Sequence, residues 1–306
     1  MKPQLLLPDK RIWRRELPGG GDVVVSPGDR VQPHTPVARG QVPAPPVVVP
    51  LAQAQPLVVE GQEVQSGEVI ARRKKLIGSG EEVQAPIAGK VLLISEGEVL
   101  LQPPPLALML EAQLPGSIAA VRAGWGADVE GCFGLLRGWG SWGVSQHGIL
   151  GEDVVVAAEP LTTSSLQALT MQHLRAIVAG SWGEEAPPPE VVTDIPSVLF
   201  TEPLQGRPMA TPIAEALQAH KGRAVALELG QSASGGRLAF ASDTPPVQQC
   251  FGPGAWVRAA DGQVGRLAAL GERPRFFASG IHCIPADVDL GDRTETLAVD
   301  SLEWIA

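Results

Sequence analysis

Tyrosine is absent from this 306-residue chain, and cysteine is scarce, with three residues only. Cys132, Cys250 and Cys283 are widely spaced and form no Cys-x-x-Cys pair, which argues against a disulfide framework and against a cysteine-based zinc site. Such cysteine usage is typical of a protein of the reducing cytoplasm, which is where we expect the chain to act.

Long apolar runs are also lacking. No stretch of about 18 uncharged apolar residues occurs, so we expect no transmembrane helix. The first 17 residues, MKPQLLLPDKRIWRREL, carry charges where a signal peptide needs its apolar segment. Hydrophobic residues make up 44% of the chain and charged residues 19%, which indicates a globular protein. The 35 glycines and 29 prolines predict many short strands and tight turns.

Excess positive charge is missing too. The chain has a formal net charge of −9; residues 1–112 are balanced, whereas residues 113–244 carry 7 basic and 13 acidic side chains and residues 245–306 carry 5 and 8. Nucleic-acid binding depends on cations that neutralise phosphates. The acidic balance therefore disfavours free nucleic acid as a partner.

The most informative feature that is present is a duplication. Gly28 to Ala38 and Gly61 to Ala71 both read Gly-x-x-Val-x5-[Val/Ile]-Ala, offset by 33 residues, and each follows a short apolar run. A period of this size indicates a repeated supersecondary unit. Valine favours strands and glycine favours turns, so the unit is predicted to be strand, turn, strand. We expect one closed β module over residues 20–103, with the copies related by a pseudo-twofold and Val31 and Val64 as equivalent core positions.

Proline-rich linkers and changes in composition suggest three domains, and we place them at residues 1–112, 113–244 and 245–306. The fold class expected is mainly β with an α/β middle region. In the first domain, the linkers lie between the two copies, at residues 43–50, and after the second copy, at residues 103–105.

A short motif follows the second copy. It runs Ala85-Pro-Ile-Ala-Gly-Lys-Val91 and resembles the barrel-sandwich hybrid fold of biotinyl and lipoyl carriers, of RnfC-type electron-transport subunits and of an insert in the largest RNA polymerase subunit. The resemblance covers residues 20–103. In the carriers, the modified lysine lies within Glu-Ala-Met-Lys-Met or Asp-Lys-Ala. Here the corresponding basic run has no flanking Met or Asp, so we expect no biotin, lipoate or other cofactor. The run is instead a candidate docking patch for an acidic partner. It consists of Arg72, Arg73, Lys74 and Lys75.

The middle domain alternates strands and helices. Strands are predicted at residues 153–157, 175–179, 197–200 and 224–229. One helix is predicted over 162–173 with a Thr or Ser cap, and a second is predicted to begin with Thr211 as N-cap and Pro212 at the next position. This order indicates a small α/β layer on a partly parallel sheet. The Gly- and Trp-rich stretch from Gly124 to Gly143 is expected to form tight β turns.

The last domain contains a second recognisable pattern. The spacing of Val257, Gly262, Gly265 and Leu267 resembles the KOW motif of NusG-type transcription factors and several ribosomal proteins, which implies a small SH3-like barrel. A closing hairpin is expected over residues 288–299 and a final strand over 302–305. The whole chain resembles KOW-motif-containing proteins with an N-terminal barrel-sandwich hybrid region, which implies an architecture without an activity. Candidate contacts for phosphate, bases or a protein partner are Trp256, Arg258, Arg266, Arg273, Arg275, Phe276 and Phe277.

Catalytic motifs are incomplete. No Gly-x-Ser-x-Gly nucleophile elbow occurs. Gly180 to Gly183 lacks the spacing and the lysine of a phosphate loop and reads as a strand-end turn. Cys132 could pair with His147 as nucleophile and base, but nothing near it in sequence lowers the thiol pKa. His282 and Cys283 should point to opposite faces of a strand.

The five histidines, at positions 34, 147, 173, 220 and 282, form no His-x-His or His-Glu-x-x-His group. The sequence therefore assigns no metal ligands, and a metal site could arise only by tertiary assembly. It also assigns no catalytic and no cofactor-binding residues.

Three functions follow from these observations. A noncatalytic interaction or scaffold protein, acting through β modules in a cytoplasmic assembly, is favoured. A transcription- or ribosome-associated factor that contacts RNA or polymerase through the KOW barrel is the alternative. An enzyme with a site in the α/β region is the third. We expect protein partners, no membrane span, and no generic RNA binding at physiological salt.

Overall fold

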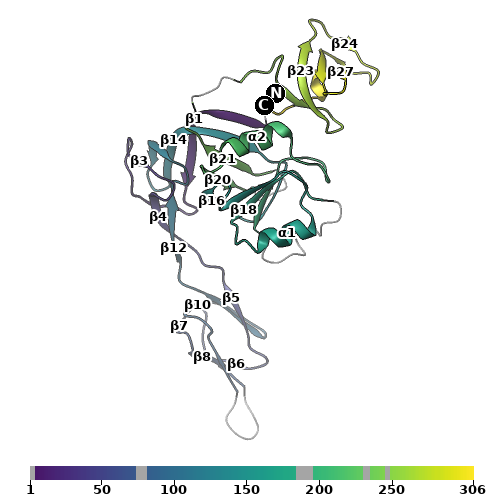
Figure 1. The fold of residues 1–306 in the computed structure, drawn as a ribbon. Coiled ribbons are helices and arrows are strands. Elements are labelled where there is room, and N and C mark those ends of the chain that lie inside the picture. Colours follow the sequence, from purple (N-terminus) through teal and green to yellow (C-terminus); the bar gives the residue numbers. More distant parts are fainter. Residues whose placement is uncertain (1–3, 74–80, 184–195, 230–234, 245–248) are drawn as a thin grey trace.

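The computed structural model describes residues 4–73, 81–183, 196–229, 235–244 and 249–306. These residues are mainly in β-strands, with two α-helices among them. Figure 1 shows an elongated molecule in which a body of sheets and helices carries a narrow β arm at one end and a small β unit at the other. None of the described helices has the length and hydrophobicity that a membrane-crossing helix requires.

The largest sheet joins segments from both sides of the boundary expected at residue 112. Its order is β16–β20–β21–β14–β13–β3, and β1 also pairs with β14, from Leu5 opposite Leu136 to Glu16 opposite Gly126. Two strands from the first 42 residues, β1 and β3, therefore share a sheet with strands of the middle region. The strands are β1 (Leu5–Glu16), β3 (Arg30–Val31), β13 (Gly116–Arg122), β14 (Gly126–Arg137), β16 (Gln146–Ile149), β20 (Ala224–Glu228) and β21 (Arg237–Ala241).

The stretch Gly124–Gly143 was expected to form tight turns, and this expectation is wrong: it contains the 12-residue strand β14 and the short strand β15 (Gly140–Trp142). The glycines of β14 make room for aromatic rings. A Cβ atom on Gly134 would lie 2.1 Å from the Phe240 ring, and one on Gly131 would lie 2.4 Å from the Phe133 ring. Here glycine is required by close packing against aromatic rings and not by a turn.

The middle region has the expected α/β layer. Its sheet has the order β15–β19–β18–β17, and the last three strands are parallel. The elements are β17 (Val154–Ala157), α1 (Thr163–Thr170), β18 (Ala176–Ala179), β19 (Ser197–Phe200) and α2 (Thr211–Ala219). The strand β20, expected in the same layer, belongs instead to the large sheet and is antiparallel to its neighbours.

The two helices pack on opposite sides of β18. Leu166 of α1 contacts the cluster of Ile177 and Ala179, whereas Ile213 and Leu217 of α2 lie in the larger core with Val178. Thr162 caps α1 as predicted. The N-cap of α2 is Ala210 and not Thr211, and no side chain forms a capping hydrogen bond there. The Glu202 carboxylate accepts a 2.9 Å hydrogen bond from the Ala210 amide itself.

The duplicated pattern folds as two copies of the same local unit. The Gly28 amide donates to the Ile118 carbonyl, and the Gly61 amide donates to the Val91 carbonyl, both at 2.8 Å. The Ala112 amide likewise donates to the Thr35 carbonyl, and the Ala85 amide donates to the Glu68 carbonyl, which has the equivalent position in the second copy. The first copy uses β3, β4 (Pro36–Val42), β12 (Leu106–Glu111) and β13, and β2 (Gly21–Val23) pairs with β4. The second uses β7 (Glu63–Val64), β8 (Val69–Arg72), β9 (Glu82–Gln84) and β10 (Gly89–Ser95).

The copies do not share a module, so the expected pseudo-twofold within residues 20–103 is wrong. Val31 and Val64 are both buried, but Val31 lies in a core with Trp13 and Phe133, whereas Val64 lies in a separate core inside the arm. The arm occupies residues 43–105 and is inserted between β4 and β12, which pair from Val42 opposite Leu106. In the second copy, the equivalent position is the connection between the paired strands β8 and β9.

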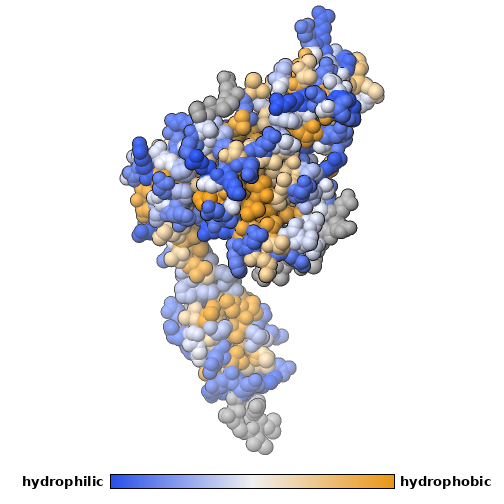
Figure 2. Space-filling view, viewed as in Figure 1, coloured by the Kyte–Doolittle hydropathy of each residue, from blue (hydrophilic) through white to orange (hydrophobic). Residues whose placement is uncertain are grey.

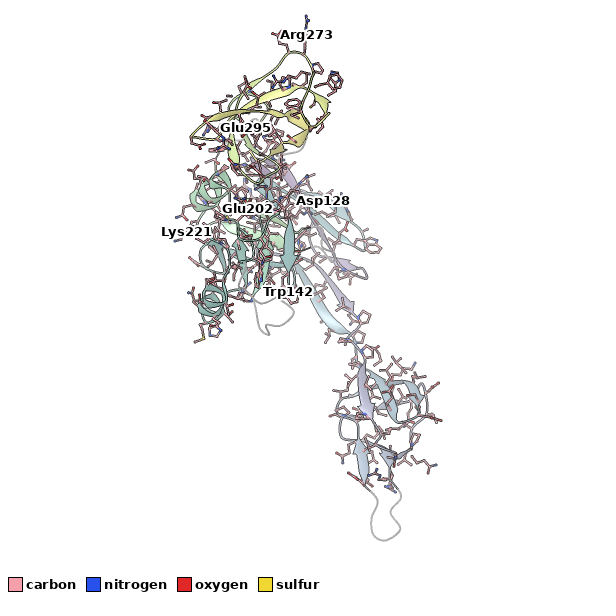
Figure 3. All side chains as sticks on the ribbon, turned by 90° about the vertical axis from the view of Figure 1, so that its right-hand side faces the viewer. Asp128, Trp142, Glu202, Lys221, Arg273 and Glu295 are labelled. Atoms are coloured by element: carbon pink, nitrogen blue, oxygen red, sulfur yellow. The ribbon has the colours of Figure 1, made fainter. Side chains whose placement is uncertain are left out.

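The arm closes around its own core with two small sheets, β5–β11–β10–β7 and β6–β8–β9. The strands not yet given are β5 (Val47–Pro50), β6 (Gln55–Pro56) and β11 (Glu98–Gln102). Ala85 of the Ala-Pro turn is buried in this core. Figures 1 and 3 show that the arm stands clear of the body in both views.

The C-terminal unit is a five-stranded sheet of order β27–β26–β23–β22–β28, with a separate β24–β25 hairpin. Val257 and Leu267 are buried in its core, and Gly262 has a φ of +85°, which favours glycine. The expected hairpin forms from β26 and β27. The strands are β22 (Trp256–Arg258), β23 (Val264–Leu270), β24 (Arg275–Phe276), β25 (His282–Cys283), β26 (Pro285–Asp289), β27 (Thr294–Ala298) and β28 (Glu303–Trp304).

The two chain ends lie side by side where the C-terminal unit meets the body (Figure 1). The Leu5 amide donates to the Ile305 carbonyl at 2.7 Å, and the Gln4 amide donates to the Trp304 carbonyl at 2.9 Å. Ile305 is fully buried in the core of the body. The last residues therefore join the C-terminal unit to the N-terminal strand.

Candidate functional site

The outer face of the larger arm sheet carries an apolar row. Leu100 of β11 lies opposite Val48 of β5 on one side and Leu93 of β10 on the other. Val48 is 54% exposed and Leu93 is 50% exposed. The neighbouring residues Val99 and Leu101 are fully buried, so the strand alternates between core and solvent. We call Val48, Leu93 and Leu100 the apolar row.

The apolar row is contiguous because directly opposed side chains in adjacent strands lie about 4.5–5.5 Å apart at Cβ. A register irregularity after Val91 adds Leu92, which is also exposed, beside it. Figure 2 shows apolar surface on the arm. Single exposed apolar residues are common, but a cross-strand group on a projecting unit is typical of a contact surface.

Polar residues border the apolar row on both sides. Glu98 lies opposite Pro50 and Ser95 at one border, and Lys90 lies opposite Gln102 at the other. An apolar centre with a polar rim is the usual anatomy of a protein–protein contact.

In the basic run predicted on the arm, the two arginines that the structure describes are paired with acidic side chains. Arg72 forms a 2.6 Å ion pair with Glu82, which lies opposite it in the β8–β9 hairpin, and Arg73 lies 3.6 Å from Glu81. Lys74 and Lys75 lie outside the described residues. Exposed pairs of this kind contribute little free energy, but they cancel the field that would attract an acidic partner.

Arg258, expected to contact a partner, is not at the surface. Its side chain is 2% exposed and forms ion pairs with Glu202 and Glu303, and its Nη2 also donates to the Gln4 side chain at 3.2 Å. Its role is therefore to bind the C-terminal unit to the body. Burial raises the pKa of the Glu202 carboxyl, and the charge of Arg258 opposes this shift.

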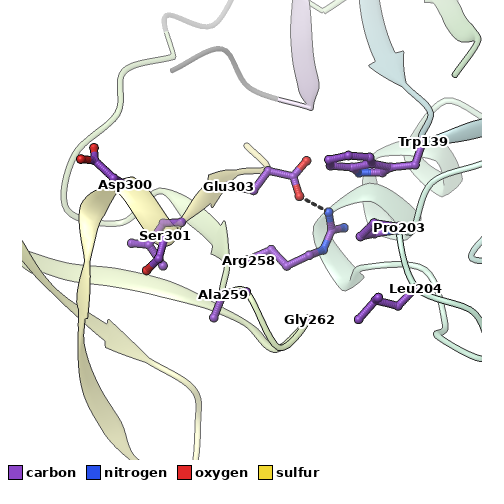
Figure 4. A pocket seen from close by; sticks show the side chains of 11 residues that line it. Trp139, Pro203, Leu204, Arg258, Ala259, Gly262, Asp300, Ser301 and Glu303 are labelled. Atoms are coloured by element: carbon purple, nitrogen blue, oxygen red, sulfur yellow. Dashed lines mark hydrogen bonds and ion pairs between the residues drawn. The ribbon is translucent and has the colours of Figure 1, made fainter. Parts of the chain in front are cut away.

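A pocket of about 300 Å³ lies beside this buried arginine. Figure 4 shows the Arg258–Glu303 pair facing Trp139, with Pro203 and Leu204 on the wall of the same pocket. Both guanidinium Nη atoms are engaged by protein groups. The Nε atom of Arg258 has no hydrogen-bond partner among the described residues, and the acidic residues Asp300 and Glu303 also line the pocket.

The remaining predicted residues divide into two groups. Trp256 is half-buried and contacts the core of the body, and the Arg266 guanidinium lies 4.6 Å from the centre of its ring. Trp256 therefore packs between the C-terminal unit and the body. The β24–β25 hairpin, in contrast, projects. Phe276 is 76% exposed and stacks on His282 at 4.5 Å, and Arg275 lies 5.0 Å from the Phe277 ring. Figure 3 shows Arg273 at the extremity of the same unit.

One group of titratable side chains was missed in the sequence. His34, in the turn after β3, and His147, on β16, converge on Glu111 at the end of β12. Oε2 of Glu111 lies 3.3 Å from Nδ1 of His34 and 2.9 Å from Nε2 of His147. The His147 Nε2 atom is buried and has no partner aligned for a hydrogen bond among the described residues. We call these three residues the His–Glu–His cluster.

The surroundings of the His–Glu–His cluster favour a neutral imidazole at His147. Burial lowers the pKa of His147, and the nearby Glu111 charge opposes the shift. The main chain on both sides is held by arginines: Arg15 donates to the Glu111 carbonyl at 2.8 Å, and Arg175 donates to the His147 carbonyl at 3.1 Å. Burial lowers the pKa of Arg15 to about 10, which leaves it charged at neutral pH.

The nucleophile–base pair considered for Cys132 and His147 does not form. The Cys132 thiol donates to the Thr244 carbonyl at 3.4 Å, and burial raises its pKa, which disfavours the reactive thiolate. His282 is exposed and Cys283 is buried, as the strand alternation predicted. His220 lies 3.2 Å from the Ser242 hydroxyl, but this hydroxyl is nearly buried and also contacts Thr244 Oγ1.

Sequence reasoning missed the apolar row and the His–Glu–His cluster for different reasons. In the sequence, Val47-Val48-Val49 and Val99-Leu100-Leu101 are uninterrupted apolar runs, and such runs suggest strands that are buried on both faces. Only the strand pairing shows that one face is solvent. The cluster residues are 77 and 36 positions apart along the chain, so no local spacing could reveal them.

No family model matches this chain, and no curated protein is significantly similar to it in sequence. The functional argument below therefore depends on the geometry of the chain itself.

Proposed function

We propose that this chain is a noncatalytic interaction protein that docks a partner protein on the outer face of its arm. The observation that carries the proposal is the apolar row on β5, β11 and β10, displayed away from the arm core. The exposed faces of these Val and Leu side chains contribute only cross-strand contacts to the isolated chain and leave apolar surface in water. Burial against a partner removes this surface from water and gives a binding free energy.

The partner expected has an apolar strip flanked by a basic group and an acidic group. Glu98, on one border of the apolar row, would meet the base, and Lys90, on the other border, would meet the acid. Such charges chiefly set orientation and association rate, whereas the apolar centre sets the dissociation rate. We further propose that the arm is a barrel-sandwich hybrid used as a docking module and that the assembly is cytoplasmic.

The test uses charge insertion in the apolar row. In the native host, tagged wild-type chain is compared with Leu93→Glu and Val48→Glu by quantitative cross-linking of its complexes. The control is Gln84→Glu, which adds the same charge at an exposed position on the other arm sheet. We expect the same partners with wild type and control, and at least about a tenfold loss with either row variant, since a desolvated charge costs several kcal/mol.

Two outcomes would contradict the proposal. Complexes that survive both row variants would show that the partner binds elsewhere. A purified wild-type chain that dimerises in sedimentation analysis, and becomes monomeric with Leu93→Glu, would show that the row binds a second copy of the chain.

A second function is favoured by the β24–β25 hairpin of the C-terminal unit. An exposed Phe276 stacked on His282, with Arg273 and Arg275 beside it, is the combination of aromatic surface and positive charge that binds unpaired bases. We propose this as the route by which a KOW-type barrel of this chain would contact RNA. The acidic surroundings, with 8 acidic and 5 basic residues over 245–306, oppose it.

The two functions differ in their dependence on salt. Binding of an unstructured RNA by wild type and by the double variant Arg273→Glu, Arg275→Glu is measured by fluorescence anisotropy at two salt concentrations. Micromolar binding that weakens with salt and disappears in the double variant would favour the RNA function. Negligible binding by both chains is the result that the docking function predicts.

A further inference from the structure

We propose that His34, Glu111 and His147 bind a divalent transition-metal ion of the Zn²⁺ class at the base of the arm. Their three ligand atoms all lie within 4.8 Å of one another. Metal–nitrogen and metal–oxygen bonds of about 2.0–2.1 Å at tetrahedral angles put ligand atoms about 3.3 Å apart. The distances of 3.3 Å and 2.9 Å from Glu111 Oε2 to the two histidines are close to this spacing.

The geometry at His147 favours metal coordination. Nε2 of His147 is buried, and no described group is aligned to form a hydrogen bond with it, although Glu111 Oε2 is near. The contact with Glu111 is close but is not aligned as a hydrogen bond, and buried polar atoms without an aligned hydrogen bond are uncommon in folded proteins. A metal ion between the imidazole and the carboxylate would satisfy both.

The ligand types select the metal. Two imidazole nitrogens and one carboxylate suit Zn²⁺, Ni²⁺, Cu²⁺ or Fe²⁺, whereas Mg²⁺ and Ca²⁺ require oxygen ligands. His34 is on the solvent side of the cluster, with its side chain 70% exposed, so a water molecule can complete the coordination. The Arg15 and Arg175 hydrogen bonds hold the main chain of Glu111 and His147, as the outer contacts of metal sites do.

The position of the site gives the ion a structural consequence. His34 and Glu111 belong to the unit from which the arm departs, whereas His147 belongs to β16, the outer strand of the large sheet next to β20. A bound ion would join the base of the arm to the body. Metal binding needs no partner protein, so this inference can fail or succeed independently of the docking function.

The experiment uses the full, untagged chain after treatment with a chelator. Zn²⁺ binding is measured by isothermal titration calorimetry, and Co²⁺ by its visible absorption. We expect one ion per chain, visible bands typical of four- or five-coordinate Co²⁺, a higher midpoint of thermal unfolding with Zn²⁺, and no displacement by excess Mg²⁺.

Variants separate the proposed site from adventitious binding. His34→Ala removes an exposed ligand and should leave the fold intact, and Glu111→Gln keeps the main-chain bond to Arg15. Loss of a group that only orients a metal ligand weakens metal affinity by about 10–100-fold. Each of these two variants should weaken Zn²⁺ binding by more than that. The control His282→Ala removes another exposed histidine and should bind as wild type does. Equal affinity in wild type and His34→Ala, no stoichiometric binding, or displacement by Mg²⁺ would overturn the proposal.

Discussion

Nη2 of Arg258 lies 2.8 Å from Oε2 of Glu202, and both side chains are almost completely buried. Arg258 belongs to β22 of the C-terminal unit, whereas Glu202 follows β19 of the α/β layer and also accepts a hydrogen bond from the amide of Ala210, the N-cap residue of α2. One carboxylate thus joins a helix N-terminus to a separate sheet. The Gln4 side chain completes the contact, so three distant parts of the chain meet at one guanidinium.

Removing the arginine should destabilise the protein strongly. Arg258→Met would leave the Glu202 carboxylate buried without its partner, which costs about 3–5 kcal/mol in comparable buried pairs. Urea unfolding followed by circular dichroism measures the change. The control is Arg293→Met, at an exposed arginine 3.4 Å from Asp292 and from Glu295, where a change within about 0.5 kcal/mol is expected. Equal effects of the two substitutions would contradict the structural role of Arg258.

The pH dependence of stability should carry the signature of Glu202. Burial raises its folded-state pKa above the ordinary value of 4.5, so the folded state retains the proton over a pH range in which the unfolded state has lost it. Stability from this group is therefore fully present below pH 4.5 and is lost as pH rises through the raised pKa.

Glu202→Gln removes this titration. Unfolding free energies of wild type and Glu202→Gln measured from acidic to neutral pH should differ progressively, with wild type losing stability relative to the variant as pH rises. Glu215→Gln, at an exposed position of α2, serves as the control and should follow the wild-type curve. Parallel curves for wild type and Glu202→Gln would show that this carboxyl does not titrate with a raised pKa.

The glycines of β14 should not tolerate a methyl group. Gly134→Ala would place Cβ 2.1 Å from the Phe240 ring, which must then move within a packed core, at a cost of about 1–3 kcal/mol. Gly252→Ala is the matched control, because a Cβ atom at that position would have no neighbouring atom within 4 Å. There the expected effect is neutral or slightly stabilising. Thermal unfolding compares the two, and a neutral Gly134→Ala would show that Phe240 has room to shift.

Local patterns in the sequence predicted local structure well. The strands and caps around Val154, Thr162 and Val257 depend on residues within a few positions of one another, and the structure has them where expected. The failure at Gly134 has a nonlocal cause, because the ring that requires glycine there is Phe240, which is distant in sequence. A Gly-rich string alone cannot distinguish a turn from a strand that packs closely against an aromatic ring.

The candidate sites depended on tertiary structure in the same way. His34, Glu111 and His147 come from a turn and two strands that are not sequence neighbours, so only the pairing of the sheets brings them together. Arg258 looked like a surface cation because no nearby residue indicated that Glu202 would bury it. The residues Arg273, Arg275, Phe276 and Phe277 could be named as candidate contacts because they form a local cluster around Pro274, but the hairpin that displays Phe276 was not predicted.

The duplication gives the last and most discriminating prediction. Val31 and Val64 occupy equivalent places in two copies of one unit but are buried in different cores. Val31→Ala and Val64→Ala each remove buried methyl groups and should each cost about 2 kcal/mol locally. Because the cores are separate, the effects should be confined to different parts of the chain.

Hydrogen–deuterium exchange with mass spectrometry distinguishes the two variants. Val64→Ala should accelerate exchange of amides in residues 43–105 and leave β13 and β14 unchanged, since the arm opens around its own core. Val31→Ala should accelerate exchange in β3, β13 and β14 and leave the arm unchanged. Each variant is the control for the other, because both make the same substitution at the same place in the repeat. Exchange that rises in both regions with either variant would mean that the two copies unfold as one cooperative module.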